Sequence, residues 1–286
     1  MKSLITILGA VLALQSVLSL PASAQSASNP IPYGNNKKAG SYITLDGARL
    51  YFETYGHGAP LVLIHGNGGN IAYMKPQIEF FAREYMVIVM DCRGRGNSDL
   101  GPDSLTYMQM AKDVVGILDH LHLNSAFVVG RSDGGIISLL LALHYPERIR
   151  RVAAFAANLT PDTTALYPFF YNQVVQDRKH ADEMLAKKDT GQNWKVIQQR
   201  NRLMECQPQI TVGDLRRISC PVLVLSTDRD IIPLDHTLLI YRNIARANLC
   251  IFAGETHYVT TENPDLFNAT VAKYFKEPFK GEELRR

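Results

Sequence analysis

One serine in this chain stands between two glycines, in the run Gly130-Arg131-Ser132-Asp133-Gly134. Apolar residues 126–129 precede the first glycine, and an apolar pattern with helical spacing follows from 136 to 145. This pattern predicts a strand, a sharp turn and a helix, which together strain the central residue and expose its side chain at the sheet edge. Ser132 is therefore a candidate nucleophile for attack on an acyl carbon. The pattern alone is weak evidence, since it arises by chance in roughly one chain in ten of this length.

An acid and a base follow the serine in the order that a catalytic triad of this kind requires. A buried strand is predicted just before Asp230, and the last apolar strand is predicted just before His257. In such a site the histidine accepts the serine proton and returns it to the leaving group, while the carboxylate fixes the histidine tautomer and stabilises the imidazolium. We therefore predict a triad of Ser132, His257 and Asp230, with Asp228 as an alternative to Asp230.

A glycine-rich turn, residues 65–70, follows the apolar strand predicted at residues 60–64. Backbone N–H groups in such a turn are unpaired and point outward, which suits a developing oxyanion. The Lys-Ser/Thr ending of a phosphate-binding loop is absent. We expect the backbone N–H groups of Asn67 and Asp133 to form an oxyanion hole. His65 precedes the turn without a neighbouring acid, and we interpret it as structural.

Strands alternate with helices over most of the chain, which predicts a parallel sheet covered by helices on both faces. A hairpin at residues 41–55 opens this α/β domain with two antiparallel strands. The Arg- and Gly-rich residues 91–98 are interpreted as a turn braced by Arg–Asp pairs rather than an anion site. Residues 158–218 contain aromatics and helical patterns but no buried strand, which predicts a helical cap over the nucleophile.

The N-terminus has the pattern of a secretory signal. Lys2 precedes a mostly apolar run, residues 4–20, and small residues follow up to an expected cleavage after Ala24. Polar residues interrupt the run, which makes it short for a membrane span. We expect an exported protein, periplasmic or secreted, without a stable membrane anchor after cleavage. Residues 25–40 lack periodicity and are predicted to be a flexible linker before a domain over residues 41–286.

The composition is that of an ordinary globular protein. Apolar residues make up 46% of the chain, charged residues 20%, and the net charge is +3 with no basic block. Nothing therefore indicates a nucleic acid or an anionic membrane as partner. The four cysteines are expected to be buried free thiols, with Cys220 and Cys250 as the pair that a single disulfide would join. No metal or organic cofactor is expected, because the histidines lack ligand spacing.

From about Ser41 to Phe275 the chain resembles an α/β-hydrolase. The motifs H-G-x-G-G, D-x-R-G-x-G-x-S, G-x-S-x-G-G, a strand followed by D-x-D, and G-x-x-H occur in that order. The resemblance implies an α/β-hydrolase fold, with a mostly parallel eight-stranded sheet flanked by helices and a small helical cap inserted at about 158–218.

Within that superfamily, the Ser-Asp-Gly-Gly-Ile run, Tyr145-Pro146 and Ala157-Asn158 are similar to the biphenyl-hydrolase-like, valacyclovir-hydrolase type. In that group the aspartate after the nucleophile is associated with the α-amino group of amino-acid esters, which implies Asp133 as a substrate contact. Arg131 stands where that group has an aromatic residue. Its positive charge would oppose a cationic substrate and favour an acidic one.

The favoured prediction is a secreted or periplasmic serine hydrolase that cleaves carboxylic esters or related acyl bonds of a small molecule through an acyl-enzyme. An alternative with the same triad is hydrolysis of a carbon–carbon bond or a lactone, which cap and pocket residues would decide. A third alternative is a non-catalytic ligand-binding protein on the same fold, which loss of a triad member would favour. Epoxide and haloalkane hydrolysis are disfavoured, because relatives with those activities usually carry Asp at the nucleophile position.

Overall fold

The structure is a computed structural model that describes residues 30–279. The signal predicted at residues 1–24 and the first part of the predicted linker, residues 25–29, lie outside the described residues. The described chain from Pro32 onward belongs to one compact unit.

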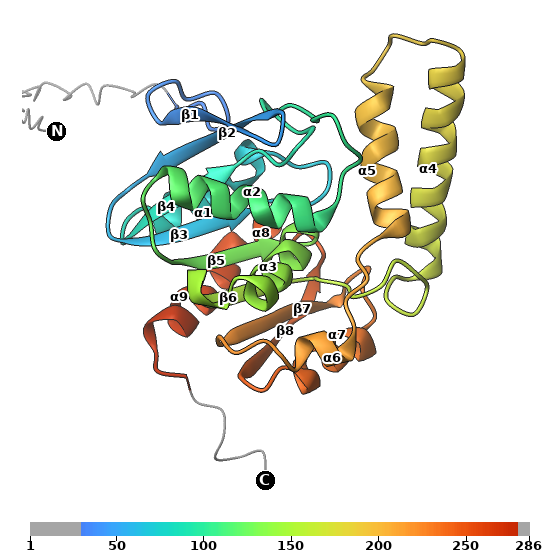
Figure 1. Ribbon diagram of the computed structural model, residues 1–286. Helices are drawn as coiled ribbons and strands as arrows, with labels where there is room; N and C mark the ends of the chain where they lie inside the picture. Colours follow the sequence, from blue (N-terminus) through green and yellow to red (C-terminus); the bar gives the residue numbers. More distant parts are fainter. Residues whose placement is uncertain (1–29, 280–286) are drawn as a thin grey trace, which may run out of the picture. The chain divides into compact units, whose positions relative to one another are not determined.

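An eight-stranded sheet forms the centre of this unit (Figure 1). The strand order is β1-β2-β4-β3-β5-β6-β7-β8; β2 pairs antiparallel with β1 and β4, and all other neighbours are parallel. The strands are β1 (Gly40–Leu45), β2 (Ala48–Tyr55), β3 (Ala59–Ile64), β4 (Tyr85–Met90), β5 (Ala126–Arg131), β6 (Ile149–Phe155), β7 (Val222–Arg229) and β8 (Ala247–Thr256). The mostly parallel eight-stranded sheet predicted from the sequence is confirmed.

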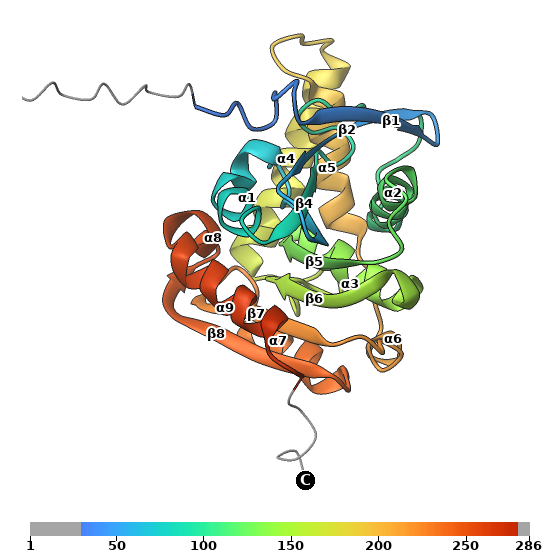
Figure 2. The same cartoon turned by 90° about the vertical axis from the view of Figure 1, so that its left-hand side faces the viewer.

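Helices cover both faces of the sheet (Figure 2). One face packs against α2, α3 and α7, and the other against α1, α8 and α9. The helices are η1 (Ile71–Met74), α1 (Lys75–Phe81), α2 (Tyr107–His120), α3 (Asp133–His144), η2 (Pro146–Arg148), α4 (Pro168–Ala186), α5 (Trp194–Cys206), α6 (Val212–Leu215), α7 (Leu234–Asn243), α8 (Val259–Glu262) and α9 (Pro264–Lys276).

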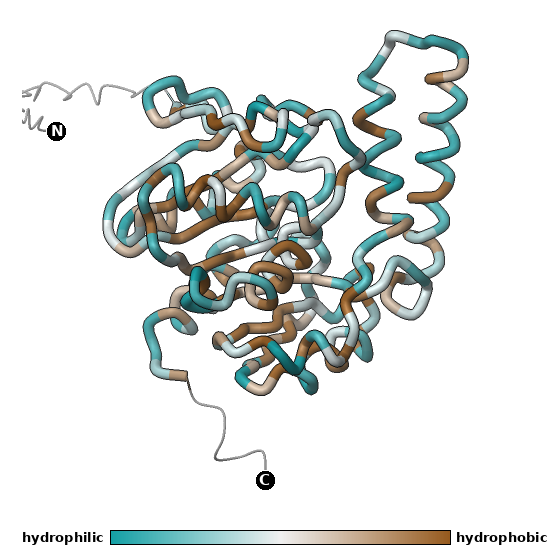
Figure 3. The backbone as a smooth tube through the Cα atoms, in the orientation of Figure 1, coloured by the Kyte–Doolittle hydropathy of each residue, from teal (hydrophilic) through white to brown (hydrophobic). Residues whose placement is uncertain are grey.

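The apolar strands explain this two-faced packing. Successive side chains of a strand point to opposite faces, so a strand that is covered on both sides is apolar at every position. In β3, Val62 and Ile64 belong to one core cluster, whereas Leu61 and Leu63 belong to the other. Figure 3 shows the hydrophobic colour concentrated in the strands and in the helix faces against them.

The segment for which the sequence predicted a cap, residues 158–218, contains α4, α5 and α6. Helices α4 and α5 lie side by side as an antiparallel hairpin that stands out from the sheet (Figure 1). Arg178 of α4 contacts Glu205 of α5 and its own helix neighbour Asp182. The far end of the hairpin is hydrophilic (Figure 3). The two helices contact each other far more than they contact the strands.

The sequence predicts a flexible linker over residues 25–40, but the structure ties residues 33–36 to the sheet. Tyr33 is buried, and the backbone N–H groups of Gly34 and Asn36 donate to the Glu53 carboxylate at 3.0 and 2.8 Å. Glu53 is fully buried in β2, and a buried carboxylate requires hydrogen-bond donors. The prediction is therefore wrong for this stretch, because the chain before β1 supplies those donors.

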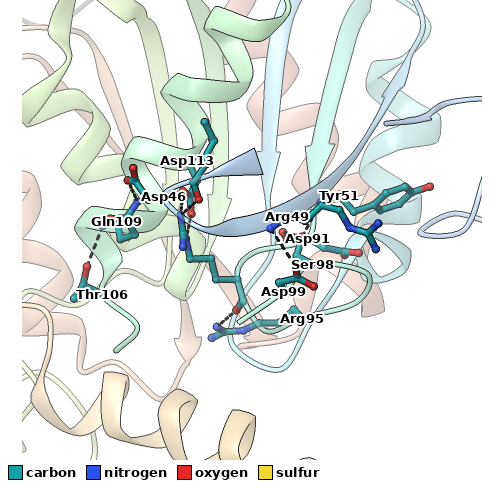
Figure 4. Close-up of polar contacts among 12 residues, drawn as sticks. Asp46, Arg49, Tyr51, Asp91, Arg95, Ser98, Asp99, Thr106, Gln109 and Asp113 are labelled. Atoms are coloured by element: carbon teal, nitrogen blue, oxygen red, sulfur yellow. Dashed lines mark hydrogen bonds and ion pairs between the residues drawn. The ribbon is translucent and has the colours of Figure 1, made fainter. Parts of the chain in front are cut away.

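The turn after β4 is braced by Arg–Asp pairs, as predicted. Arg93 Nε and Nη2 each lie 2.7 Å from a carboxylate oxygen of Asp113, a fully buried residue of α2. Arg95 lies in the same turn, with Nη1 donating to the Arg93 carbonyl oxygen at 2.7 Å. Figure 4 shows Arg95 in the turn and Asp113 on α2. The positive charge of Arg95 lies next to the turn that contains Ser132, with Arg95 Nη2 3.5 Å from Asp133 Oδ2.

Candidate active site

Ser132 occupies the sharp turn between β5 and α3, as predicted. Its backbone has φ 56° and ψ −117°, a conformation that is costly for a residue with a side chain. The Ser132 N–H donates to the Phe155 carbonyl oxygen at 2.8 Å, which ties the turn to β6. A Cβ on Gly130 would lie 2.0 Å from the Gly134 oxygen, and one on Gly134 would lie 2.2 Å from the Ile64 oxygen. Both glycines are therefore required for the close approach of strand and helix.

His257 and Asp230 meet at the ends of two neighbouring strands. Asp230 follows β7, His257 follows β8, and His257 Nδ1 lies 2.7 Å from Asp230 Oδ1. The Asp230 carboxylate has no exposed surface and also accepts the Ile232 N–H at 3.2 Å. Asp228, the alternative acid, instead accepts the Gly254 N–H and is exposed. The structure thus pairs the histidine with Asp230.

Ser132 and His257 line the same cavity, which has a volume of about 580 Å³. Its walls come from the loop after β3, the turn at Ser132 between β5 and α3, the turn at His257 after β8, and the α4–α5 hairpin. The other lining residues that bear on its chemistry are Asn67, Tyr73, Arg131, Asp133, Phe169 and Arg200. The cavity is large enough for a small organic molecule, and all the sequence-predicted site residues except the buried Asp230 face it.

The two proposed oxyanion donors lie on opposite sides of the nucleophile in the chain. A Cβ on Gly66 would lie 3.1 Å from the Ser132 Cβ, so the loop that carries Asn67 runs directly beside the elbow. Among the described residues no acceptor takes the backbone N–H of Asn67 or of Asp133. Both N–H groups therefore meet one requirement of the predicted oxyanion hole, which is that no protein acceptor occupies them.

The Asp133 side chain is buried and already surrounded by donors. Its Oδ1 accepts from the Tyr107 hydroxyl at 2.9 Å, and its Oδ2 accepts from Asn67 Nδ2 at 3.0 Å and lies 3.5 Å from Arg95 Nη2. Burial raises the pKa of the Asp133 carboxyl, and the Arg95 charge opposes that rise. Sequence reasoning missed Tyr107 and Arg95, because they come from α2 and the turn after β4 and share no motif with Asp133.

Arg131 brings a positive charge next to Ser132. Its Nη2 donates to the His257 carbonyl oxygen at 3.2 Å, and its guanidinium lies 5.2 Å from the centre of the Tyr258 ring. Within the described chain no carboxylate forms an ion pair with it, and its buried Nε has no acceptor. Burial lowers the pKa of Arg131, but arginine stays protonated at neutral pH. The cavity therefore holds a cation without a carboxylate partner.

Arg200, on α5, is a site residue that sequence reasoning missed. Its Nε donates to Asn67 Oδ1 at 3.1 Å, and burial lowers its pKa. A Cβ on Gly68 would lie 2.9 Å from Arg200 Nη2, so the guanidinium packs directly on the glycine-rich loop. No local signal in the sequence marks this residue, because only the folded hairpin brings α5 to the loop.

His65 is structural, as predicted. Its Nε2 accepts the Cys92 N–H at 3.1 Å, and its Nδ1 lies 2.7 Å from the Gly66 carbonyl oxygen. Burial is the main cause that lowers its pKa to about 4. The ring thus joins the ends of β3 and β4 in its neutral form.

All four cysteines are free thiols. Cys92 and Cys220 are buried as expected, but Cys206 at the end of α5 is exposed and Cys250 is only partly buried. The expectation of burial fails at Cys206 because α5 belongs to the outlying hairpin. In the part of the chain that the structure describes, no group of His, Cys, Asp or Glu side chains is arranged to hold a metal ion. No helix there has the length and hydropathy of a membrane span.

The order of strands and helices and the sharp turn at Ser132 agree with a known fold. Residues 59–188 match a family model described as alpha/beta hydrolase fold. The chain has this fold.

Similar proteins include 3-oxoadipate enol-lactonase 2 of Acinetobacter baylyi, 28% identical over 262 residues that cover 82% of this chain and 96% of that protein. The 2-hydroxymuconate semialdehyde hydrolase of Pseudomonas sp. CF600 is 27% identical over 277 residues, or 85% of this chain and 96% of that protein. The crystal structure of the enol-lactonase from Burkholderia xenovorans LB400 superposes with a TM-score of 0.70 at 21% identity, covering 83% of this chain and all of that one.

Because burial depresses the His65 pKa from 6.5 to about 4, its contribution to stability is present above pH 6.5 and lost as the pH falls toward 4. The full difference corresponds to about 3 kcal/mol of unfolding free energy. Burial raises the pKa of Asp91 to about 6, so Asp91 adds stability as the pH falls through the same range. The contribution of His65 is therefore measured by comparing a variant with the wild type. We expect His65→Gln to lose less stability between about pH 7 and about pH 4.5 than the wild type, in urea denaturation. The exposed-residue control His57→Gln should match the wild type, and an unchanged pH dependence in His65→Gln would contradict this account.

Proposed function

We propose that the protein is a serine hydrolase that opens lactones of small, carboxylate-bearing molecules. The observation that carries this proposal is one cavity lined by Ser132 with its strained backbone, by His257, and by Arg131, whose Nε has no acceptor in the described chain. The similar proteins support the bond type, since one is named an enol-lactonase. They favour the lactonase or carbon–carbon alternative over the ester cleavage that the sequence placed first.

In the proposed mechanism the Ser132 hydroxyl attacks the lactone carbonyl carbon while His257 Nε2 takes its proton. Asp230, 2.7 Å from His257 Nδ1, stabilises the imidazolium. The N–H groups of Asn67 and Asp133 bind the carbonyl oxygen as it becomes an oxyanion. When the tetrahedral species collapses, the ring oxygen leaves with the proton from His257. Water, activated by the same histidine, then cleaves the acyl-serine and restores the hydroxyl.

The charge of Arg131 supports an acidic substrate. A substrate carboxylate about 4 Å from the guanidinium would gain from about 1 kcal/mol in water to about 4 kcal/mol near a partly buried site. The names of two relatives refer to an adipate and a muconate, which carry carboxylate groups. The implied α-amino contact at Asp133 is less well supported, because three donors already surround that carboxylate.

Carbon–carbon bond hydrolysis by the same triad is the second candidate. The muconate semialdehyde in the name of one relative has neither an ester nor a lactone bond, so its hydrolysis breaks a carbon–carbon bond. In that reaction His257 would return its proton to a carbon atom of the leaving group rather than to an oxygen. Comparing turnover of a lactone with that of a vinylogous diketone acid separates the two candidates.

Ser132→Ala is expected to lower kcat on an acidic lactone by at least about a thousand-fold, because the nucleophile is removed. A fluorophosphonate probe should label the wild type at Ser132 and leave Ser132→Ala unlabelled. The control Ser41→Ala, at an exposed position of β1, should keep both activity and labelling. Folded wild type that resists the probe would instead favour a non-catalytic binding protein.

Arg131→Met should reduce kcat/KM on a carboxylate-bearing lactone about ten-fold or more relative to its neutral methyl-ester analogue, because the substrate charge loses its partner. The ratio between the two substrates isolates the charge, since losing the bond to the His257 carbonyl affects both equally. Arg83→Met, at an exposed position, is the control. A ratio that does not change in Arg131→Met would show that the charge does not select substrates.

We also propose export, on the N-terminal sequence alone. Removal of a signal after Ala24 would give a mature chain that begins with Gln25. Mass spectrometry of the protein expressed with its full N-terminus in a bacterial host should find this terminus in the periplasm or the medium. An intact Met1 terminus in the cytoplasmic fraction would contradict the proposal.

A further inference from the structure

The side chain of Asn67 is held at both ends. Its Oδ1 accepts from Arg200 Nε at 3.1 Å, and its Nδ2 donates to Asp133 Oδ2 at 3.0 Å. An amide that both donates and accepts in this way has one favourable orientation. The residue therefore bridges α5, in the hairpin, and the first residue of α3, in the core.

The core end of this bridge is fixed. Asp133 is buried at the start of α3, where Tyr107 and Arg95 also hold its carboxylate. Arg95 is fixed in turn by the Arg93 carbonyl oxygen, at 2.7 Å. A buried carboxylate with several donors is a rigid anchor, because moving any partner leaves a polar group unpaired.

The hairpin end of the bridge is the hydrogen bond from Arg200 to Asn67, which a substitution of Arg200 would remove. Asn67 sits among Gly66, Gly68 and Gly69, and Gly68 has a φ of 71°. Glycines allow many backbone conformations, so the loop alone does not fix the direction of the Asn67 N–H. The guanidinium of Arg200 packs on Gly68 and bonds the Asn67 side chain, which restrains the residue from the cavity side.

We propose that Arg200 is a positioning residue: through the Asn67 side chain it aligns the Asn67 backbone N–H with the oxyanion, and so couples the seating of α5 to the rate of acyl transfer. The inference rests on the proposed function, since it requires Ser132 chemistry with an oxyanion at Asn67. Arg200 acts through Asn67, whereas Asp133 is the fixed anchor of the bridge rather than a site for a substrate amine.

A neutral ester separates this role from simple attraction of a substrate carboxylate. With p-nitrophenyl acetate, we expect Arg200→Ala to lower kcat about ten-fold or more and to change KM less than about two-fold, since displaced oxyanion donors cost up to about a thousand-fold. Arg202→Ala, an exposed arginine of the same helix, is the matched control and should behave as the wild type. Arg200→Lys should recover part of the rate, because an ammonium can donate to the same Asn67 oxygen.

Asn67→Ala provides the second arm, since it removes the bridging side chain but keeps the backbone N–H. We expect its kcat to fall as in Arg200→Ala, and the double variant to be no slower than Asn67→Ala alone, because both changes break one bridge. Thermal unfolding midpoints close to that of the wild type would establish that the variants fold.

Three outcomes would overturn the inference: Arg200→Ala as fast as Arg202→Ala, additive losses in the double variant, or a loss confined to carboxylate-bearing substrates. Failure of the proposed function is distinguishable from these. In that case Ser132→Ala would hydrolyse the neutral ester at the wild-type rate, whatever the Arg200 variants do.

Discussion

The strained backbone of Ser132 is the constraint on which the rest of the site depends. A residue with a side chain at φ 56° costs about 1–3 kcal/mol and persists only where its surroundings over-determine it. Here the bond from its N–H to Phe155 and the close approach of Gly134 to the end of β3 provide that support. Parallel pairing of β5 with its two neighbours is what makes both contacts available. The sheet thus holds Ser132, a residue of the cavity lining, in a backbone geometry that an isolated strand, turn and helix would not keep.

The two residues that flank Ser132 carry opposite charges, and these charges differ in how far they are compensated by neighbouring residues. The Asp133 carboxylate lies next to the elbow but is compensated by Arg95 and by two neutral donors. Among the described residues, the Arg131 guanidinium contacts the His257 carbonyl oxygen and the face of Tyr258 but forms no ion pair. Of the two residues that flank Ser132, the anion is therefore compensated by an ion pair and the cation is not. This imbalance is the physical reason for proposing an acidic lactone rather than an amino-acid ester as the substrate.

Residues that directly follow a buried strand could be found from the sequence, whereas residues that depend on packing between distant elements could not. Ser132, Asp230 and His257 each end a strand, and parallel strands place such residues at one edge of a sheet. The sequence favoured Asp230 over Asp228, and the structure agrees, because Asp228 lies within β7 and accepts the Gly254 N–H while Asp230 pairs with His257. Arg200 and Tyr107 lie in the middle or at the start of helices without any motif. The contact of residues 33–36 with the sheet likewise depends on the buried Glu53, which accepts hydrogen bonds from this stretch. No local sequence pattern indicated this contact.

The α4–α5 hairpin packs mainly on itself and contacts the core through few residues, among them Leu203. In such an arrangement, substitutions in the hairpin could change the substrate preference without changing Ser132, His257 or Asp230. Arg200 limits that freedom, because the helix that shapes one wall of the cavity also touches the loop beside the reacting carbonyl. On the proposed role of Arg200, selectivity and turnover are linked, and a remodelled hairpin must keep the contact with Asn67.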